Sequence, residues 1–367
     1  MLVRLGDLCD IKSSKRIFES EYVPIGIPFI RGQEVTNKTI FNSNTYNCYI
    51  SKKRYEELKR NYGVPQKGDI LITAVGTIGN LCYVDKEFEF YYKDGNLLQF
   101  TNFRDDFDSK YLYYFMHNDY FKKQLNNNLI GAVQKALTMV MLQKIKVPLI
   151  DLKSQRKIIS ILSSIDDHIE RNNAMVQKLQ VLALNSFDYF SKGIDGSNSV
   201  VLRDILIERD KSPIQVNNIV DSSGDIPFFT SGETILYTNE KLATGFNIFL
   251  STGGNAKAQA YYGDVSYSTD TWCVTAKDNL QYYLYGYLKH IESQMDKLYF
   301  HGTGLKHLQK PIFLKSFINI PNEISLKKYN SIVEPIYMQI SKIEQSIIKL
   351  QRLKNKLLAL LINQQLV

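Results

Sequence analysis

The residues whose types and spacing could support catalysis do not complete a site in this chain. Glu57-Leu58-Lys59 has the ExK spacing of a nuclease, but no Pro-Asp dipeptide accompanies it. The surrounding charged run from Lys52 to Arg60 is typical of a solvated helix face. No Asn-Pro-Pro-Tyr or Asp-Pro-Pro-Tyr segment is present, so the usual pocket for a flipped adenine is also missing. The sequence therefore predicts a protein that is not an enzyme.

Nucleotide and metal sites are not supported either. No Gly-Lys dipeptide occurs, which excludes a GxxxxGK[ST] phosphate loop, and Gly302–His307 lacks the third glycine and the acidic partner of a dinucleotide site. The five histidines show no HExxH spacing, and the four cysteines form no CxxC pair. We expect no cofactor, no metal site, and thiols that stay reduced in a cytoplasm.

The charge of the chain favours a polyanionic partner. The 367 residues carry a formal net charge of +8, and Tyr, Asn and Gln are abundant beside Lys and Arg, which suits contacts with phosphates and base edges. A drift toward Lys, Asn, Ile and Tyr codons in an A·T-rich genome would produce the same composition. Charge alone therefore indicates nucleic acid without establishing it.

The sequence contains no segment typical of export or membrane insertion. Met1 to Asp10 carries charge within its apolar stretch, unlike a signal peptide, and no run approaches the roughly 20 apolar residues of a membrane span. We expect a cytoplasmic protein that does not contact a membrane.

The chain contains an internal repeat, in which the same series of segments occurs twice. A strand-like opening, an Ile-Pro-Phe segment, a strand that runs into a glycine-rich turn, an aromatic helix and a glycine-led segment follow in the same order. In the first half these are Val3–Leu8, Ile27–Ile30, Asp69–Thr73, Tyr111–Met116 and Gly131–Leu137. In the second half they are Val201–Ile205, Ile226–Phe229, Asn247–Thr252, Tyr283–Leu288 and Gly302–Leu308.

Each half ends in a long heptad pattern, which predicts a helix with a continuous apolar seam. The first seam comprises Ile158, Leu162, Ile165, Ile169, Asn172, Val176, Leu179, Ala183, Ser186 and Phe190. The second comprises Ile332, Ile336, Ile340, Ile343, Ile347, Leu350, Lys354, Leu357 and Leu361. Because such seams must be covered, we expect the two helices to pack on each other.

These patterns predict an α+β chain with two mixed α/β domains, related by an internal pseudo-two-fold repeat, and two long antiparallel coiled-coil helices that separate them. We place the first domain at 1–150, the first helix at 151–192, the second domain at 193–322 and the second helix at 323–367. A polar, glycine-rich connector, 191–199, marks the boundary between the repeats.

This layout resembles the specificity subunit of type I restriction-modification enzymes over essentially the whole chain. The resemblance rests on Leu5–Leu8, Ile27–Phe29, Ile226–Phe228, Val147–Leu152, Gln155–Ile159 and Ile165-Asp166. The second copy departs from the pattern, because Lys328–Asn330 stands where the first has Gln155–Lys157. The resemblance implies two target recognition domains that read a bipartite, gapped site in double-stranded DNA. It also implies helices that dock two methyltransferase subunits and, through them, motor-nuclease subunits.

The residues that touch bases diverge among such domains, so candidates must come from the residues themselves. Polar side chains on loops that recur in both repeats suit base and phosphate contacts, although such Thr, Ser and Lys are often local caps or solvated surface. In the first half the candidates are Arg31, Gln33, Thr73, Thr77, Gln134 and Lys135. In the second half they are Thr230, Ser231, Thr252, Asn255, Lys257, Thr303 and Lys306.

Apolar helix positions outside the seams are candidates for contacts with partner subunits, with core packing as an equal alternative. They are Leu182, Leu184, Phe187, Leu353, Leu358 and Leu360. A second hypothesis for the whole chain is a non-catalytic coiled-coil interaction scaffold without DNA specificity, which predicts no salt-dependent affinity for DNA.

Overall fold

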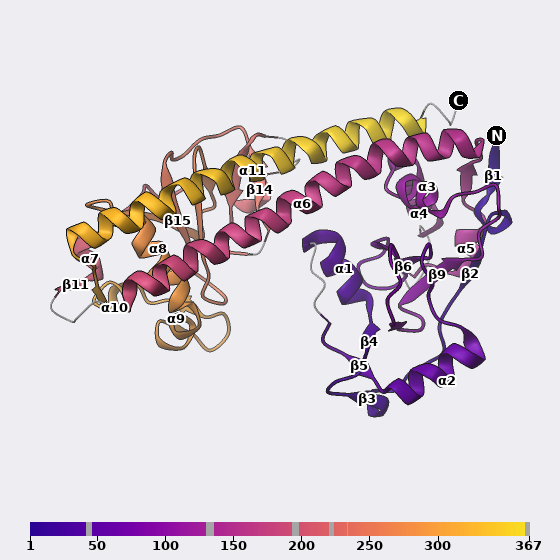
Figure 1. Ribbon diagram of the computed structural model, residues 1–367, viewed down its shortest axis with the longest axis horizontal. Helices are drawn as coiled ribbons and strands as arrows, with labels where there is room; N and C mark the ends of the chain where they lie inside the picture. The colour runs from indigo at the N-terminus through magenta and orange to yellow at the C-terminus, as the bar shows by residue number, and fades with distance from the viewer. Residues whose placement is uncertain (42–45, 130–135, 193–197, 220–223, 233, 364–367) are drawn as a thin grey trace. The chain divides into compact units, whose positions relative to one another are not determined.

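The computed structural model describes residues 1–41, 46–129, 136–192, 198–219, 224–232 and 234–363. The chain forms two compact units (Figure 1). Unit 1 comprises Met1–His168 and Leu350–Val367, and unit 2 comprises Ile169–Lys349. Each unit therefore contains one mixed α/β domain and part of each of two long helices.

Where the structure describes it, the domain of unit 1 is built on three small sheets. The first is the antiparallel pair β1 (Leu2–Arg4) and β10 (Lys146–Pro148). The second has the order β2 (Asp10–Lys12), β9 (Leu97–Thr101), β6 (Ile70–Thr73), β7 (Leu81–Tyr83), all antiparallel. The third has the order β3 (Tyr22–Val23), β5 (Tyr49–Ile50), β4 (Ile27–Ile30), β8 (Tyr91–Tyr92), in which β4 and β8 are parallel.

Short helices join these strands. They are α1 (Gly32–Phe41), α2 (Lys52–Tyr62), α3 (Ser109–Met116), α4 (Asp119–Leu129), α5 (Met139–Gln143) and two 3-10 turns, η1 (Leu5–Asp7) and η2 (Glu19–Glu21). Local sequence sets their limits. The Ser51 hydroxyl accepts a hydrogen bond from the Arg54 N–H at the start of α2, and Gly63 ends that helix at φ 75°. The aromatic helix α3 buries Tyr111, Leu112 and Phe115 in the main core of unit 1.

In its described residues, the domain of unit 2 forms four sheets. The pair β11 (Ser199–Val201) and β21 (Phe317–Asn319) is antiparallel, as is the four-stranded sheet β12 (Leu206–Glu208), β18 (Thr271–Ala276), β15 (Phe246–Ser251), β16 (Ala258–Tyr262). The third sheet is β14 (Leu236–Thr238), β13 (Ile226–Phe229), β17 (Ser266–Tyr267), with β13 and β17 parallel. The fourth is the hairpin β19 (Phe300–His301), β20 (His307–Leu308). The helices are α7 (Leu202–Ile205), α8 (Gln281–His290), α9 (Glu292–Leu298), α10 (Lys310–Phe313) and the 3-10 turn η4 (Val216–Asn218).

The two domains share one topology, which confirms the internal repeat. The sheet order β2-β9-β6-β7 of unit 1 matches β12-β18-β15-β16 of unit 2, and the Ile-Pro-Phe strands β4 and β13 each pair in parallel with a short tyrosine-containing strand. Strand registers make Thr73 equivalent to Ser251, since each stands at the end of the central strand. Among the described residues, unit 1 also has α1, α2 and β3, and unit 2 also has the β19–β20 hairpin.

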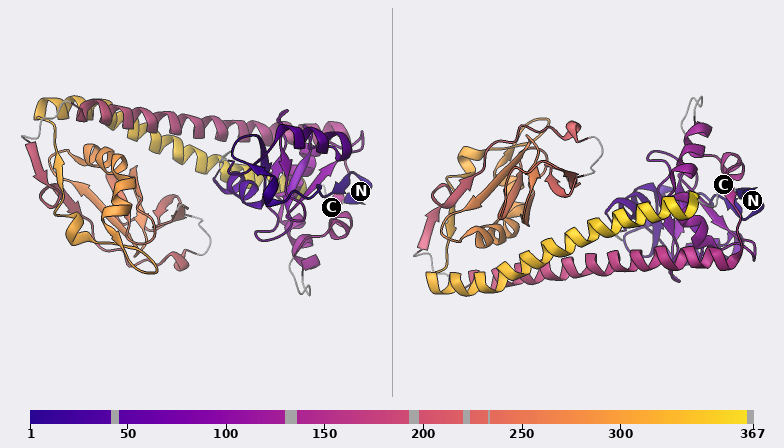
Figure 2. Two further views of the ribbon diagram at one scale, coloured as in Figure 1. Left: turned by 90° about the horizontal axis from the view of Figure 1, so that it is seen from below. Right: turned by 90° about the horizontal axis from the view of Figure 1, so that it is seen from above.

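Both heptad patterns form single helices, α6 (Leu152–Ser191) and α11 (Glu323–Asn363), which run side by side (Figures 1 and 2). In unit 1, Asp166 of α6 contacts Lys354 near the end of α11; in unit 2, the Phe190 ring lies 5.6 Å from that of Tyr329 near the start of α11. Early α6 therefore meets late α11, and late α6 meets early α11, so the pairing is antiparallel. The helix α11 continues through Pro335. None of the helices in the described ranges is long and apolar enough to cross a membrane.

The predicted start of the second seam is wrong by one residue. Ile332 is 44% exposed, whereas Tyr329 and Val333 are fully buried. The step from Ile332 to Ile336 and the next to Ile340 are both of four residues, which breaks the alternation of four and three that holds a seam in place. Counting Tyr329, Val333, Ile336 and Ile340 restores that alternation.

Candidate nucleic-acid interface

One hairpin loop is built in the same way in both domains. The Thr73 hydroxyl donates to the Thr77 carbonyl at 2.5 Å and accepts from the Asn80 N–H at 2.9 Å. The Ser251 hydroxyl donates to the Asn255 carbonyl at 2.7 Å and accepts from the Lys257 N–H at 3.0 Å. Each buried hydroxyl thus satisfies two backbone groups and holds an exposed loop tip, Thr77 or Asn255.

This arrangement corrects one predicted DNA contact. The Thr73 side chain is 1% exposed, and its hydroxyl is used inside the loop. Thr73 stands where the hairpin loop begins, but its side chain positions the loop tip and does not itself face solvent. Thr77, four residues later, is the exposed polar position of this loop.

A second segment meets the hairpin loop of each domain at an equivalent point. The Leu137 N–H donates to the Ala74 carbonyl at 2.9 Å, and the Leu308 N–H donates to the Thr252 carbonyl at 3.0 Å. The predicted pairing of Gly131–Leu137 with Gly302–Leu308 therefore holds at its last residue. Gln134 and Lys135 lie outside the described residues.

In unit 2 this segment is the β19–β20 hairpin, which carries two of the candidates. Thr303 is exposed at its tip. The Lys306 ammonium lies 2.9 Å from Oδ2 of Asp296, and the Lys306 carbonyl accepts from the Gly254 N–H at 2.9 Å. The backbone of Lys306 is therefore tied to the hairpin loop, and its charge is paired at the surface.

The remaining unit 2 candidates converge on the same place. The Ser231 and Thr252 hydroxyls both donate to the carbonyl of Asp270, and the Lys257 ammonium donates to the carbonyl of Gly232 at 3.1 Å. Thr230 closes its own turn by donating to the Thr234 carbonyl at 3.1 Å. Residues from three separate stretches of sequence thus form one polar cluster beside the Asn255 loop tip.

In unit 1 the equivalent segment after β4 holds Arg31 and Gln33. The Arg31 guanidinium donates to both carboxylate oxygens of Glu34, at 2.8 and 3.3 Å, and the Glu34 side chain is only 3% exposed. The hydrogen bond to Glu34 raises the pKa of Arg31, against the opposing effect of burial. Arg31 therefore compensates a buried carboxylate and is held rigidly in place, while Gln33 is exposed on the first turn of α1.

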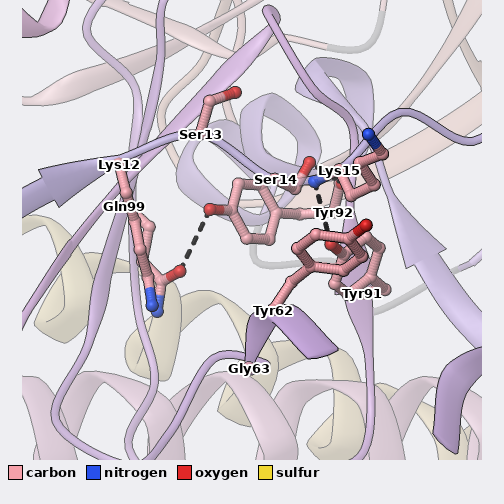
Figure 3. A pocket seen from close by; sticks show the side chains of 9 residues that line it. All are labelled: Lys12, Ser13, Ser14, Lys15, Tyr62, Gly63, Tyr91, Tyr92 and Gln99. Carbon is pink, nitrogen blue, oxygen red and sulfur yellow. Dashed lines mark hydrogen bonds between the residues drawn. The ribbon is translucent and has the colours of Figure 1, made fainter. Parts of the chain in front are cut away.

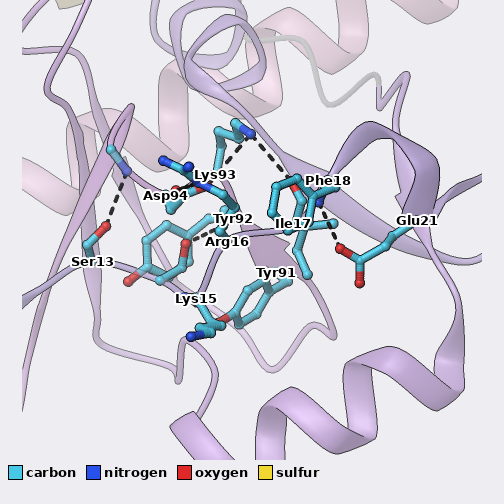
Figure 4. A network of polar contacts seen from close by, with 12 residues as sticks. Ser13, Lys15, Arg16, Ile17, Phe18, Glu21, Tyr91, Tyr92, Lys93 and Asp94 are labelled. Atoms are coloured by element: carbon cyan, nitrogen blue, oxygen red, sulfur yellow. Dashed lines mark hydrogen bonds and ion pairs between the residues drawn. The ribbon is translucent and has the colours of Figure 1, made fainter.

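A basic segment that the sequence reading missed lies beside Arg31. We call Lys12–Arg16 the first strap. Its backbone is fastened by the Ser14 hydroxyl, which donates to the Tyr92 carbonyl at 2.6 Å, and by the Lys15 N–H, which donates to the Tyr91 hydroxyl at 2.9 Å (Figure 3). The Arg16 guanidinium pairs with Asp94 at 2.9 Å (Figure 4). Within the described ranges no carboxylate lies within ion-pair distance of Lys12 or Lys15.

The first strap borders two hollows of the domain surface. Figure 3 shows one of them, lined by the strap, Tyr62, Tyr91, Tyr92 and Gln99. The other is lined by Arg16, Arg31 and Lys93, with Glu19 and Asp94 as the acidic members. Three cations from three loop segments are therefore collected at one concave face.

The second domain has a matching strap, Arg209–Lys211, directly after β12. The Tyr267 hydroxyl donates to the Asp210 carbonyl at 2.7 Å, and Arg209 donates to the Asn247 side-chain oxygen at 2.8 Å. Tyr267 and Tyr92 are equivalent, because each pairs with the last residue of the Ile-Pro-Phe strand. The signal that could have revealed the straps is a basic run at the end of the second strand of each repeat, β2 and β12.

The candidate partner-contact residues divide into two groups. Leu182, Leu353 and Leu360 are 50%, 46% and 54% exposed, and Leu184 is partly buried. Phe187 and Leu358 are 3% and 6% exposed and belong to the cores of unit 2 and unit 1, respectively. For Phe187 and Leu358 the prediction of a partner contact is corrected, since the chain's own domains cover them.

Residues 1–181 and 195–352 match the family described as the type I restriction modification DNA specificity domain, so the match covers both repeats and most of both long helices. The chain belongs to this family. The family assignment agrees with the resemblance inferred from the two repeats, and it supports the α+β organisation with two domains and two long helices.

The chain is also similar to individual specificity subunits, in sequence and in fold. It is 32% identical over 166 residues to a type I restriction enzyme specificity subunit of Haemophilus influenzae, a match that spans 45% of this chain but only 40% of that protein. It is 23% identical over 389 residues to the MjaIX specificity subunit of Methanocaldococcus jannaschii, covering 93% of this chain and 87% of the relative. The S subunit of M. genitalium shares the fold, with a TM-score of 0.60, 14% identity and coverage of 99% and 96% of the two chains.

Proposed function

We propose that this chain is the DNA-sequence-reading subunit of a type I restriction-modification complex and that it recognises a bipartite, gapped site in double-stranded DNA. The observation that carries the proposal is the repeated loop cluster. An equivalent buried hydroxyl holds an exposed polar tip in each domain. The strand registers place this loop at the same end of the four-stranded sheet as a basic strap. Two equivalent reading units in one chain suit a target with two half-sites.

The division of labour within each cluster follows from side-chain chemistry. Exposed amide and hydroxyl groups suit base edges, and cations suit phosphates. We assign base contacts to Gln33 and Thr77 in one domain and to Asn255 and Thr303 in the other. We assign phosphate contacts to both straps and, in addition, to Arg31, Lys257 and Lys306. Thr230, Ser231 and Thr252 stay candidates beside these loops, and Gln134 and Lys135 stay candidates outside the described residues.

The domain limits of the proposal follow the sequence pattern. Residues 1–150 and 193–322 act as the target recognition domains, and residues 151–192 and 323–367 act as the helices that set the gap between half-sites. Two methyltransferase subunits dock on the helix pair, with Leu182, Leu184, Leu353 and Leu360 as contact residues, and restriction subunits join through them. Catalysis is then performed by these partners and not by this chain.

The direct test is a genome-wide map of methylated adenines in the source cell with the gene intact and with it deleted. Loss of one gapped, two-part motif on deletion is the expected result and would reveal the target sequence. An unchanged map, together with duplex affinity that does not vary with salt, would favour the interaction scaffold instead. If helix length sets the gap, adding one heptad to α6 and α11 should change the gap and leave both half-site sequences unchanged.

A further inference from the structure

A charged contact is built into the otherwise apolar seam of unit 1. The Lys354 ammonium of α11 lies 2.5 Å from Oδ1 of Asp166 on α6, and the Tyr114 hydroxyl of α3 donates to Oδ2 of the same carboxylate at 2.9 Å. The ammonium also lies 5.6 Å from the centre of the Tyr114 ring. Three elements therefore meet at one carboxylate.

The surroundings of this contact are partly buried. The side chains of Lys354 and Asp166 are 19% and 33% exposed, and Tyr114 is fully buried. Leu162, Ile165 and Leu358 flank the pair and are buried. Removing one partner leaves the other partly desolvated and without its counter-charge, which costs more free energy here than at a fully exposed position.

The neighbouring heptads offer no alternative partner. If α11 slid by one heptad in either direction, Ile347 or Leu361 would replace Lys354 opposite Asp166. Both are apolar, so each slipped pairing would leave the Asp166 carboxylate without its counter-charge and facing an apolar side chain of α11. A single polar position in an apolar seam can specify register in this way, at some cost in stability.

The equivalent place in unit 2 is apolar. The repeat makes Gly286 of α8 equivalent to Tyr114, and the Phe187 ring of α6 packs directly on it. A Cβ atom at Gly286 would lie 2.6 Å from that ring. The two units thus hold the helix pair with different chemistry, and the charged contact belongs to unit 1.

We infer that Asp166, Lys354 and Tyr114 form a register lock, a positioning device that permits one alignment of α6 and α11 in unit 1. The lock itself does not depend on DNA. Its consequence for function rests on the proposed reading of a gapped site, since a single helix alignment would then select a single gap length.

Spin-label distances test the lock without DNA. Labels are attached to S164C and Q351C, which replace exposed residues of α6 and α11 in unit 1, while the four native cysteines are buried. The wild type should give one narrow distance. The variant D166L/K354L should stay folded, because apolar residues often replace a buried ion pair without loss of stability. It should show an added population shifted by about 10 Å, the length of one heptad.

Two further variants make the result decisive. D167L/K356L places the same residue types at exposed positions of the same helices, and D166K/K354D restores an ion pair with reversed charges. Both should keep the single distance. A single unshifted distance in D166L/K354L would overturn the lock, and loss of cooperative melting in that variant would show instead that the pair serves stability.

The functional consequence is tested by selecting bound DNA from a library of duplexes that differ in the gap between the two half-sites. D166L/K354L should accept at least two gap lengths with the half-site sequences unchanged, whereas D167L/K356L should accept one. If the wild type selected no duplex, the proposed function would fail while the spin-label distances still decided the lock. If D166L/K354L shifted register yet kept one gap, the link between register and gap would be wrong.

Discussion

Thr73 and Ser251 stand at equivalent ends of the central strands β6 and β15 and make the same two backbone hydrogen bonds. Each is at most 3% exposed. Two side chains of different type, far apart in the chain, therefore perform one structural task. The task is to hold a loop tip whose own residue, Thr77 or Asn255, is free to differ between the domains.

Removing either hydroxyl should loosen only the loop that it holds. T73V or S251A leaves two backbone groups unsatisfied, which we expect to lower the free energy of unfolding by about 1–3 kcal/mol. Affinity for one half-site should fall in each variant, measured with duplexes in which the other half-site is intact. The control is S164A, at an exposed serine of α6. Equal loss at both half-sites in T73V would contradict independent reading by the two domains.

Neutralising the first strap should weaken DNA binding through phosphate contacts. For K12A/K15A we expect the slope of log affinity against log salt to become shallower by about 1.8, since each phosphate contact contributes about 0.9. The selected sequence should not change. The matched control K349A/K356A removes two exposed lysines of α11. A changed motif with an unchanged slope would show that the strap reads bases.

Phe187 should matter for stability and not for partner binding. It is 3% exposed and packs against Gly286 and the Tyr283 ring, whose centre is 5.0 Å away. F187A should lower the free energy of unfolding by about 3–5 kcal/mol because it leaves a cavity. Y189A, at a neighbouring ring that is 77% exposed, should change it by about 0.5 kcal/mol or less. Chemical denaturation of both variants provides the comparison, and similar losses would place Phe187 outside the core.

Exposed leucines of the helix pair should matter for assembly and not for stability. L182S, L353S and L360S should each leave the melting temperature close to that of the wild type, because these side chains are about half exposed. We expect at least one of them to reduce co-purification with methyltransferase subunits. L358S, at a buried position, should instead lower the melting temperature. Unaltered assembly in the triple variant would remove these residues from the proposed docking surface.

Glu344 on α11 should make the stability of unit 2 depend on pH. Burial raises the pKa of this carboxyl from 4.5 to about 7, so the folded chain holds its proton more tightly than the unfolded chain does. The contribution to stability is therefore complete below the ordinary pKa of 4.5 and is lost as pH rises through about 7. E344Q should be more stable than the wild type at pH 8, and the difference should shrink toward pH 5. Denaturation at both pH values measures it, with E170Q at an exposed position as the control. A difference that is the same at both pH values would show that Glu344 does not titrate in this range.

The sequence by itself determined the repeat, the two long helices and the class of fold. Elements such as the Ile-Pro-Phe strands and the seam from Ile336 onward are specified by residues that are neighbours in the chain or recur at a fixed period, and this information is local. It also indicated where the glycine-rich hairpin loops lie, since turn residues such as Gly76 and Gly254 are visible in the sequence.

Only the tertiary structure decided which side chain on each loop faces solvent, because this depends on hydrogen bonds to residues that the sequence does not place nearby. Thr73 turned inward to meet the carbonyl of Thr77, and Arg31 paired with the buried carboxylate of Glu34. The straps are defined by hydrogen bonds between their backbone and the hydroxyls of Tyr91 and Tyr267, which come from distant parts of the sequence. Likewise, the sequence placed Lys354 in the seam, but its partner Asp166 lies on another helix, 188 positions away in the chain. Packing between distant segments made that pair, and a heptad pattern cannot show it.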